Sequence, residues 1–86
     1  MLIVKKYFAT WCGPCKQLAP VFEELKNEIT EVTFETIDVD QNKEAVIAEG
    51  IVSVPTVVLE KDGQQVYRFS GVLPKSVIAG VIKKYL

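Results

Sequence analysis

The sequence of 86 residues has no histidine, only two cysteines, one tryptophan and one methionine. Tetrahedral zinc sites draw their ligands mainly from cysteine and histidine, so this composition predicts no metal centre. The formal net charge is −1, and no basic segment of the kind that binds nucleic acid is present. The longest apolar runs are far too short to cross a membrane. These absences argue against metal-dependent, nucleic-acid-binding and membrane-spanning functions.

The first residues also lack an export signal. Met1-Leu2-Ile3-Val4 is followed directly by Lys5 and Lys6, without a small-residue cleavage pattern. We therefore expect a cytoplasmic protein, in a compartment that keeps thiols reduced. Hydrophobic residues make up 49% of the chain, enough for one small domain over residues 1–86 to bury a compact core.

The two cysteines lie in the stretch Trp11-Cys12-Gly13-Pro14-Cys15, where an apolar strand gives way to an amphipathic helix. Unpaired amide groups place about half a positive charge at a helix N-terminus. A thiolate is stabilised there and becomes a usable nucleophile. Gly13 favours a turn, and Pro14 suits the first helical turn, where no amide donor is needed. The sequence thus predicts a reactive dithiol for thiol–disulfide exchange.

Three other interpretations of the cysteine pair were weighed against this one. A zinc site would need carboxylates or a second chain to complete its ligands. A purely structural disulfide would close a loop so short that it constrains little of the unfolded chain. Two inert buried cysteines would not need the turn formed by Gly13 and Pro14. The redox interpretation accounts for both the spacing and the turn.

Hydrophobic periodicity and turn residues predict seven elements. We expect strands at Leu2–Ala9, Val32–Val39, Val57–Glu60 and Gln65–Phe69. We expect helices at Pro14–Glu28, at Lys43–Glu49 and from Pro74 onward. Gly50 should end the middle helix in a left-handed conformation, and Asp62-Gly63 should form a hairpin turn. The helical crossover makes the first two strands parallel, whereas the hairpin makes the last two antiparallel.

These motifs resemble the thioredoxin family over essentially the whole chain. The matching residues are Phe8-Ala9-Thr10-Trp11-Cys12-Gly13-Pro14-Cys15-Lys16, Pro20, Asp38-Val39-Asp40-Gln41-Asn42, Gly50-Ile51, Val54-Pro55-Thr56 and Gly71. The resemblance implies an α/β, thioredoxin-like fold in the order βαβαββα, with a four-stranded mixed sheet and helices on both faces. It also implies a protein-disulfide reductase that needs no cofactor beyond its redox-active disulfide. Electrons would come from a thioredoxin reductase or an equivalent donor, and we expect a monomer.

The resemblance implies roles for particular residues. Cys12 would be the exposed nucleophile, and Cys15 would be the buried resolving thiol. Pro55 would follow a cis peptide bond and pack against the dithiol. An apolar groove for the substrate chain would be lined by Trp11, Val54, Gly71 and Val72. The backbone of Val54 would pair with the substrate in the manner of a β-strand.

The chain departs from the family pattern in two respects. It lacks the additional strand and helix with which thioredoxins usually begin, and so approaches the minimal glutaredoxin-like outline. We therefore expect the sheet face holding residues 43–49 to be thinly covered, with exposed apolar residues or a self-association surface beside that helix. In addition, Lys6 stands where thioredoxins commonly have a buried Asp, and Thr36 stands where its lysine partner often lies.

Two placements of Lys6 follow from physical chemistry. An isolated buried ammonium is costly, so we expect the side chain to bend to the surface toward Glu35 on the neighbouring strand. In the alternative placement the ammonium points at the dithiol. It would then tune the thiol pKa by favouring the Cys15 thiolate.

Two further functions remain open. A glutaredoxin-like protein would take its electrons from glutathione, which the short outline favours and which Trp11 and Gly13-Pro14 do not. A non-enzymatic accessory module would use the same surface for binding alone. Such a module would keep its function after both Cys12 and Cys15 were replaced by serine.

Overall fold

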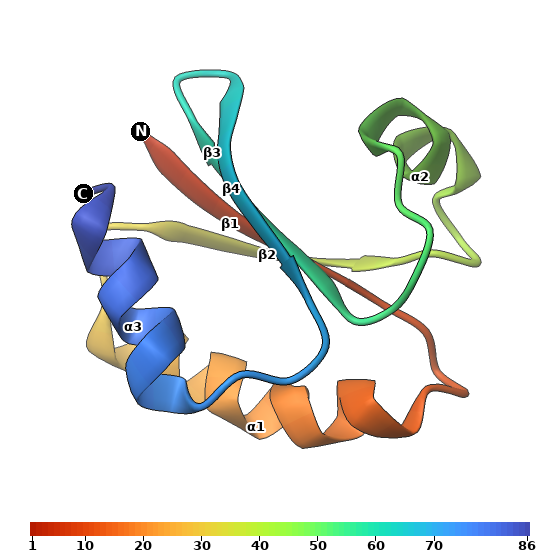
Figure 1. Ribbon diagram of the computed structural model, residues 1–86, viewed down its shortest axis with the longest axis horizontal. Coiled ribbons are helices and arrows are strands. Elements are labelled where there is room, and N and C mark those ends of the chain that lie inside the picture. Colours follow the sequence, from red (N-terminus) through yellow and green to blue (C-terminus); the bar gives the residue numbers. More distant parts are fainter.

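The computed structural model describes all 86 residues, as four strands and three helices (Figure 1). The strands are β1 (Leu2–Phe8), β2 (Thr33–Asp38), β3 (Thr56–Lys61) and β4 (Gln64–Ser70). The helices are α1 (Gly13–Glu28), α2 (Lys43–Glu49) and α3 (Lys75–Lys84). Each expected element is present in the expected order, with its ends within about one residue of the prediction, as is usual for element boundaries. None of the three helices combines the length and apolar character needed to cross a membrane.

The sheet has the strand order β2-β1-β3-β4. β1 and β2 are parallel, and β3 is antiparallel to both β1 and β4, which confirms the predicted mixed sheet. In the turn between β3 and β4, Asp62 and Gly63 have φ angles of 52° and 84°, as a tight hairpin turn with two left-handed residues requires. Gly50 ends α2 with φ 65°. The residues at these positions therefore determine both the hairpin turn between β3 and β4 and the end of α2.

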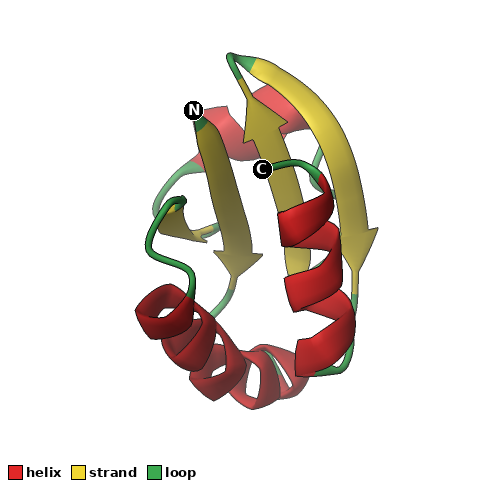
Figure 2. Ribbon diagram, turned by 90° about the vertical axis from the view of Figure 1, so that its left-hand side faces the viewer, coloured by secondary structure: helices red, strands yellow, loops and turns green.

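Helices α1 and α3 cover one face of the sheet, and α2 lies on the other (Figures 1 and 2). The main core fills the space under α1 and α3. It contains Leu2, Val4, Leu18, Phe22, Leu25, Ile29, Val32, Val57, Leu59, Ile78 and Ile82. Burying one such aliphatic side chain contributes about 1.5–3 kcal/mol, so this face carries most of the hydrophobic stabilisation. It also anchors α1, whose first turn holds the cysteine pair.

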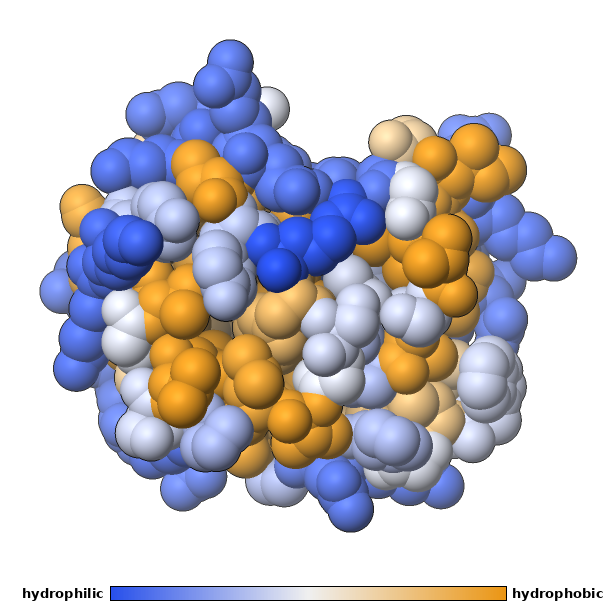
Figure 3. Space-filling view, viewed as in Figure 1, coloured by the Kyte–Doolittle hydropathy of each residue, from blue (hydrophilic) through white to orange (hydrophobic).

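The face under α2 is thinly covered, as predicted. α2 contributes no buried residue, and the small core there consists of Tyr7, Ile51 and Val58. Ile47 on this helix is 80% exposed, and Val52, just after it, is 96% exposed. Figure 3 shows hydrophobic surface around α2 at the right of the molecule. The expectation of exposed apolar residues beside α2 is therefore confirmed.

Charged side chains replace apolar cover on the rest of this face. The Lys5 ammonium on β1 donates hydrogen bonds to Glu60 at 2.8 Å and to Glu49 at 3.2 Å. Arg68 on β4 donates to the backbone carbonyl oxygens of Glu49 and Gly50. We call these four side chains (Lys5, Glu49, Glu60 and Arg68) the ionic network. It ties the C-terminal end of α2 to three strands of the sheet.

Candidate redox site

The two cysteines are joined by a disulfide whose Cα atoms are 5.3 Å apart. Cys12 is 5% exposed and Cys15 is 4% exposed. The predicted contrast between an exposed and a buried cysteine is therefore wrong for the disulfide form. The reason is packing, since both cysteines cluster with Ala9 while Phe8 and Val54 pack against the cluster.

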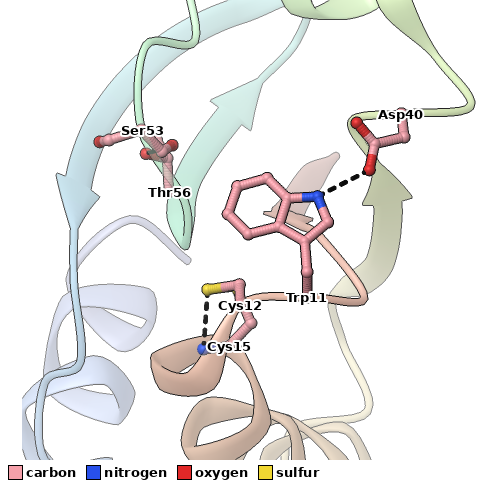
Figure 4. The surroundings of a disulfide bond; sticks show 6 residues. All are labelled: Trp11, Cys12, Cys15, Asp40, Ser53 and Thr56. Carbon is pink, nitrogen blue, oxygen red and sulfur yellow. Dashed lines mark hydrogen bonds between the residues drawn. A yellow bond between two sulfur atoms is a disulfide. The ribbon is translucent and has the colours of Figure 1, made fainter.

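Position on the helix is what distinguishes the two cysteines. Cys12 is the N-cap of α1, with extended backbone angles, and its Sγ accepts the backbone N–H of Cys15 at 3.2 Å (Figure 4). Pro14 occupies the first turn, and no acidic residue lies there to offset the positive end of the helix. The helix end thus favours negative charge on the Cys12 sulfur.

Trp11 stands beside the disulfide and is 70% exposed. Its indole N–H donates a hydrogen bond to Asp40 Oδ2 at 2.9 Å (Figure 4). The Asp40 backbone N–H in turn donates to Asp38 Oδ1 at 2.9 Å. In the sequence, Asp40 was named only among the residues that match the family. Its contact with Trp11 was not foreseen, because the two residues are 29 positions apart. The contact between Asp40 and Trp11 is therefore one that the sequence did not reveal.

The loop between α2 and β3 faces the disulfide from across the site (Figure 4). The Val54–Pro55 peptide bond is cis, as the family resemblance implied, and the Pro55 side chain is fully buried. The Thr56 hydroxyl lies 2.8 Å from both the Ser53 carbonyl oxygen and the Ser70 hydroxyl. These bonds fasten the loop to β4. The expected packing of Pro55 against the dithiol stays a prediction, since Val54 is the loop residue that packs on the cysteine cluster.

An apolar hollow of about 220 Å³ adjoins Trp11. It is lined by Trp11, Val39, Val46, Ile51, Val52, Ser53 and Val54. Two of the four predicted groove residues, Trp11 and Val54, thus come together here. Gly71 instead donates its N–H to the Pro55 carbonyl oxygen at 2.9 Å, and Val72 is exposed, so these two lie outside the hollow. The contribution of α2 to it was not foreseen, because it depends on how that helix sits on the sheet.

The expectation that Lys6 turns toward Glu35 is wrong. Side chains alternate along a strand. Lys5 is the register partner of Glu35 on β2, while Lys6 points to the opposite face, under α1. Lys6 is 5% exposed, and its Nζ lies 5.2 Å from the centre of the Phe22 ring and 5.8 Å from that of Phe8. Burial lowers the pKa of Lys6, and the Glu23 carboxylate opposes that shift.

A second cavity, of about 390 Å³, lies on this side of the sheet and brings Lys6 and Cys15 together. Thr36 also lines it, so the two positions that depart from the family pattern share one space with the cysteine. The structure holds no group of three or more cysteine, histidine, aspartate or glutamate side chains arranged to bind a metal ion.

Comparisons with known proteins agree with this site. The family model described as Thioredoxin matches residues 1–84. The thioredoxin of Listeria monocytogenes is 41% identical over 86 residues, which cover 99% of this chain and 84% of the relative. Thioredoxin-1 of Schizosaccharomyces pombe is 39% identical over 80 residues, covering 93% and 78%.

Solved structures give the same result. The X-ray structure of Fasciola hepatica thioredoxin superposes with a TM-score of 0.93 at 45% identity, covering 99% of this chain and 81% of that one. The oxidised thioredoxin of Plasmodium falciparum gives a TM-score of 0.87 at 38% identity, covering 98% and 80%. With its paired cysteines at the start of α1, the chain belongs to the thioredoxin family and is a thiol–disulfide oxidoreductase.

Proposed function

We propose that this chain, acting as a single domain over residues 1–86, reduces disulfides in other proteins, with Cys12 as the nucleophile and Cys15 as the resolving thiol. The observation that carries the assignment is the position of Cys12 at the N-cap of α1, where its sulfur accepts an amide N–H. A thiolate formed at Cys12 on reduction gains both this hydrogen bond and the field of the helix end. Cys15 lies inside the first turn.

The exchange then has two steps. The Cys12 thiolate attacks one sulfur of the substrate disulfide, and the other substrate sulfur leaves and takes up a proton. Cys15 loses its proton and attacks Cys12 Sγ, which forms the Cys12–Cys15 disulfide and releases the second substrate thiol. Two electrons and two protons pass from the dithiol to the substrate.

The surface around the disulfide supports binding of an extended substrate. Trp11 and Val54 line the apolar hollow beside α2, and Gly71 donates its N–H to the cis-proline loop. Together with Val72 they are the residues proposed to line the groove. The Val54 backbone is the segment proposed to pair with the substrate chain, which supplies affinity through main-chain hydrogen bonds. Trp11, held by Asp40, then serves as a fixed wall of this groove, and Gly13 and Pro14 shape the turn that presents Cys12.

The proposed electron donor is a thioredoxin reductase or an equivalent protein, and the proposed setting is the reducing cytoplasm. The chain is proposed to act as a monomer and to need no cofactor besides the Cys12–Cys15 disulfide. Lys6, which shares a cavity with Cys15, is proposed to tune the pKa of that thiol through its charge.

Insulin-disulfide reduction tests the proposal. Turnover is measured with NADPH and thioredoxin reductase, and in parallel with NADPH, glutathione and glutathione reductase. We expect turnover with the first pair. Turnover only with the second would establish the glutaredoxin-like function instead.

Two cysteine variants test the roles. Cys12→Ser should abolish turnover, whereas Cys15→Ser should trap mixed disulfides with the substrate. In the reduced protein Cys12 should react with iodoacetamide near neutral pH much faster than Cys15, because the helix end favours its thiolate. Preferential labelling of Cys15 would reverse the assignment. A double serine variant that keeps the protein's cellular function would instead indicate an accessory binding module.

A further inference from the structure

Residues 51–54, which we call the α2–β3 segment, join the end of α2 to the cis-proline before β3 and form the green loop below α2 in Figure 1. All four residues line the apolar hollow beside Trp11. The downstream end of the segment is fastened by the Thr56 hydroxyl, 2.8 Å from the Ser53 carbonyl oxygen. The upstream end follows directly on Gly50, the C-cap of α2. The position of the segment therefore depends on what holds the end of that helix.

Polar contacts hold the end of α2, because the helix contributes no buried residue. The last four carbonyl groups of a helix have no partner within it. In α2 the carbonyl oxygens of Glu49 and Gly50 accept N–H groups of Arg68, from Nη2 and, at 3.3 Å, from Nη1. A cation is also favourable at a helix C-terminus. The Arg68 guanidinium thus joins the backbone at the end of α2 to β4.

A β-bulge in β4 aims a second side chain at the same guanidinium. Residues three apart on a regular strand point to opposite faces. The register with β3 shifts between Leu59 and Glu60, so β4 holds one extra residue there, and Gln65 and Arg68 face the same side. Gln65 Oε1 accepts Arg68 Nη2 at 2.8 Å and Nε at 3.1 Å. The plane of the guanidinium is therefore fixed from β4 itself.

Lys5 reaches the same helix but holds a different part of it. Lys5 and Arg68 both pair with Val58, one from each neighbouring strand. The Lys5 ammonium binds only carboxylates, those of Glu49 at 3.2 Å and Glu60 at 2.8 Å. A carboxylate can follow an ammonium by rotation of its side chain. The carbonyl groups that Arg68 binds belong to the backbone that continues into the α2–β3 segment, so Arg68 controls the position of that segment more directly than Lys5 does.

We propose that Arg68 is a positioning residue for substrate binding. By holding the last two carbonyl groups of α2, it keeps the α2–β3 segment in the place where it forms one wall of the substrate groove. Arg68 bonds to Gln65, Glu49 and Gly50, and so it acts on affinity rather than on the reacting sulfurs. When the arrangement that binds is populated in only a fraction of molecules, apparent affinity falls by that fraction. This inference rests on the proposed function, because the groove is proposed for protein substrates.

The test compares Arg68→Met with the native protein in insulin reduction, with NADPH and an excess of thioredoxin reductase so that re-reduction does not limit the rate. We expect the KM for insulin to rise about tenfold, equivalent to about 1.4 kcal/mol of binding free energy. The value of kcat should change by less than about twofold, as expected when binding alone is lost. Hydroxyethyl disulfide is too small to need the groove, so its reduction in the same assay should keep the native rate.

Two further variants separate the shape of the guanidinium from its charge. Arg68→Lys keeps the charge but replaces the planar fork of donors by a compact ammonium on a flexible stem, and should keep most of the increase in KM. Lys75→Met is the matched control. The Lys75 side chain is 35% exposed, close to the 31% of Arg68. Its ion pairs are with Glu24 and Glu28 of α1, so its removal should leave the KM at the native value.

Amide hydrogen exchange measures the position of the segment without any activity. The Ile51 N–H donates to the Val46 carbonyl oxygen at 2.9 Å, and the Gly50 N–H donates to that of Ile47 at 3.1 Å. In Arg68→Met these two amides should exchange about tenfold faster, because the end of α2 opens more readily. The amides that pair β3 with β1 report global unfolding and should accelerate less.

An unchanged KM in Arg68→Met would overturn the proposal, as would equal acceleration of exchange in α2 and in the β1–β3 pairing. Losses of kcat and of hydroxyethyl disulfide reduction in Arg68→Met would also overturn it, because they would place the effect on the sulfurs. A KM restored by Arg68→Lys, or raised in Lys75→Met, would replace the guanidinium fork by charge alone. If the native protein reduces hydroxyethyl disulfide but not insulin, the proposed function fails, and hydrogen exchange alone then decides whether Arg68 holds the segment.

Discussion

The two faces of the sheet are stabilised by different physics. Under α1 and α3 the sheet contributes Val4, Val57 and Leu59 to a continuous apolar core. On the α2 side, Tyr7 and Val58 of the same strands form a small apolar cluster with Ile51. The rest of the contacts there come from the ionic network of Lys5, Glu49, Glu60 and Arg68. Longer family members extend beyond the matched region, since this chain covers 84% of the Listeria relative. Paired charges thus cover part of the sheet face on which α2 lies.

The comparison also explains how the redox site is held. The disulfide is attached to α1, on the well-packed face. One wall of the Trp11 hollow comes from α2, on the charged face. The proposed nucleophile therefore sits at the start of a helix with four buried residues, and part of the proposed substrate surface sits on a helix with none. Regions with few buried apolar contacts open most readily, so adaptability is placed on the substrate side.

The largest expected effect lies in the apolar core. Leu18→Ala removes a fully buried side chain of α1 and should lower the free energy of unfolding by about 2–5 kcal/mol, since it loses buried surface and leaves a cavity. Ile47→Ala, on the exposed side of α2, should change it by no more than about 0.5 kcal/mol. Urea denaturation measures both. Similar losses in the two variants would contradict the contrast between the faces.

The ionic network should give the next largest effect. Lys5→Met leaves the Glu60 carboxylate without its cation and leaves Glu49 with only the more distant Arg68, and it should cost about 1–3 kcal/mol. The matched control is Lys43→Met, whose lysine is exposed. A double variant that also carries Glu60→Gln should recover part of the loss, because no unpaired charge remains at that position. If Lys5→Met behaves like the control, the network contributes nothing.

Lys6 should make the free energy of unfolding depend on pH, with a smaller change than that expected for Lys5→Met. Burial lowers the pKa of Lys6. Between that lowered value and the ordinary lysine value of about 10.4, the unfolded chain binds more protons, so stability rises with pH. The native protein should therefore gain stability relative to Lys6→Met between pH 7 and pH 10, as followed by urea denaturation. A constant difference between the two would show that the ammonium is not desolvated. The difference in free energy of unfolding between the native protein and Lys43→Met should stay constant over the same pH range.

The smallest expected effect is at Trp11, where the two sides of the molecule meet. Asp40→Ala removes the acceptor of the exposed indole N–H and should change the free energy of unfolding by no more than about 0.5 kcal/mol. Fluorescence of the only tryptophan should nevertheless change, because its ring loses a fixed position. Insulin reduction should show a raised KM with little change in kcat. An unaltered KM would mean that Asp40 does not position the groove.

The sequence by itself determined the elements, their order and the place of the dithiol. Periodicity, the turn at Asp62-Gly63 and the C-cap at Gly50 involve neighbouring residues, so they can be read without knowing the fold. Cys12 and Cys15 were assigned in the same way, since a helix start and its cysteine pair lie within five residues. The cis bond before Pro55 followed from family resemblance rather than from any local pattern.

Only the tertiary structure decided what Lys5 and Lys6 do. Alternation along β1 requires them to face opposite sides, but no local signal says which side carries carboxylates. Glu49 and Glu60, which bind Lys5, are 44 and 55 positions away from it in the sequence. Cys15 lines the same cavity as Lys6 because α1 packs on that face. The low exposure of Cys12 has the same origin. Burial and charge pairing depend on segments distant in sequence, which come together only when the chain packs.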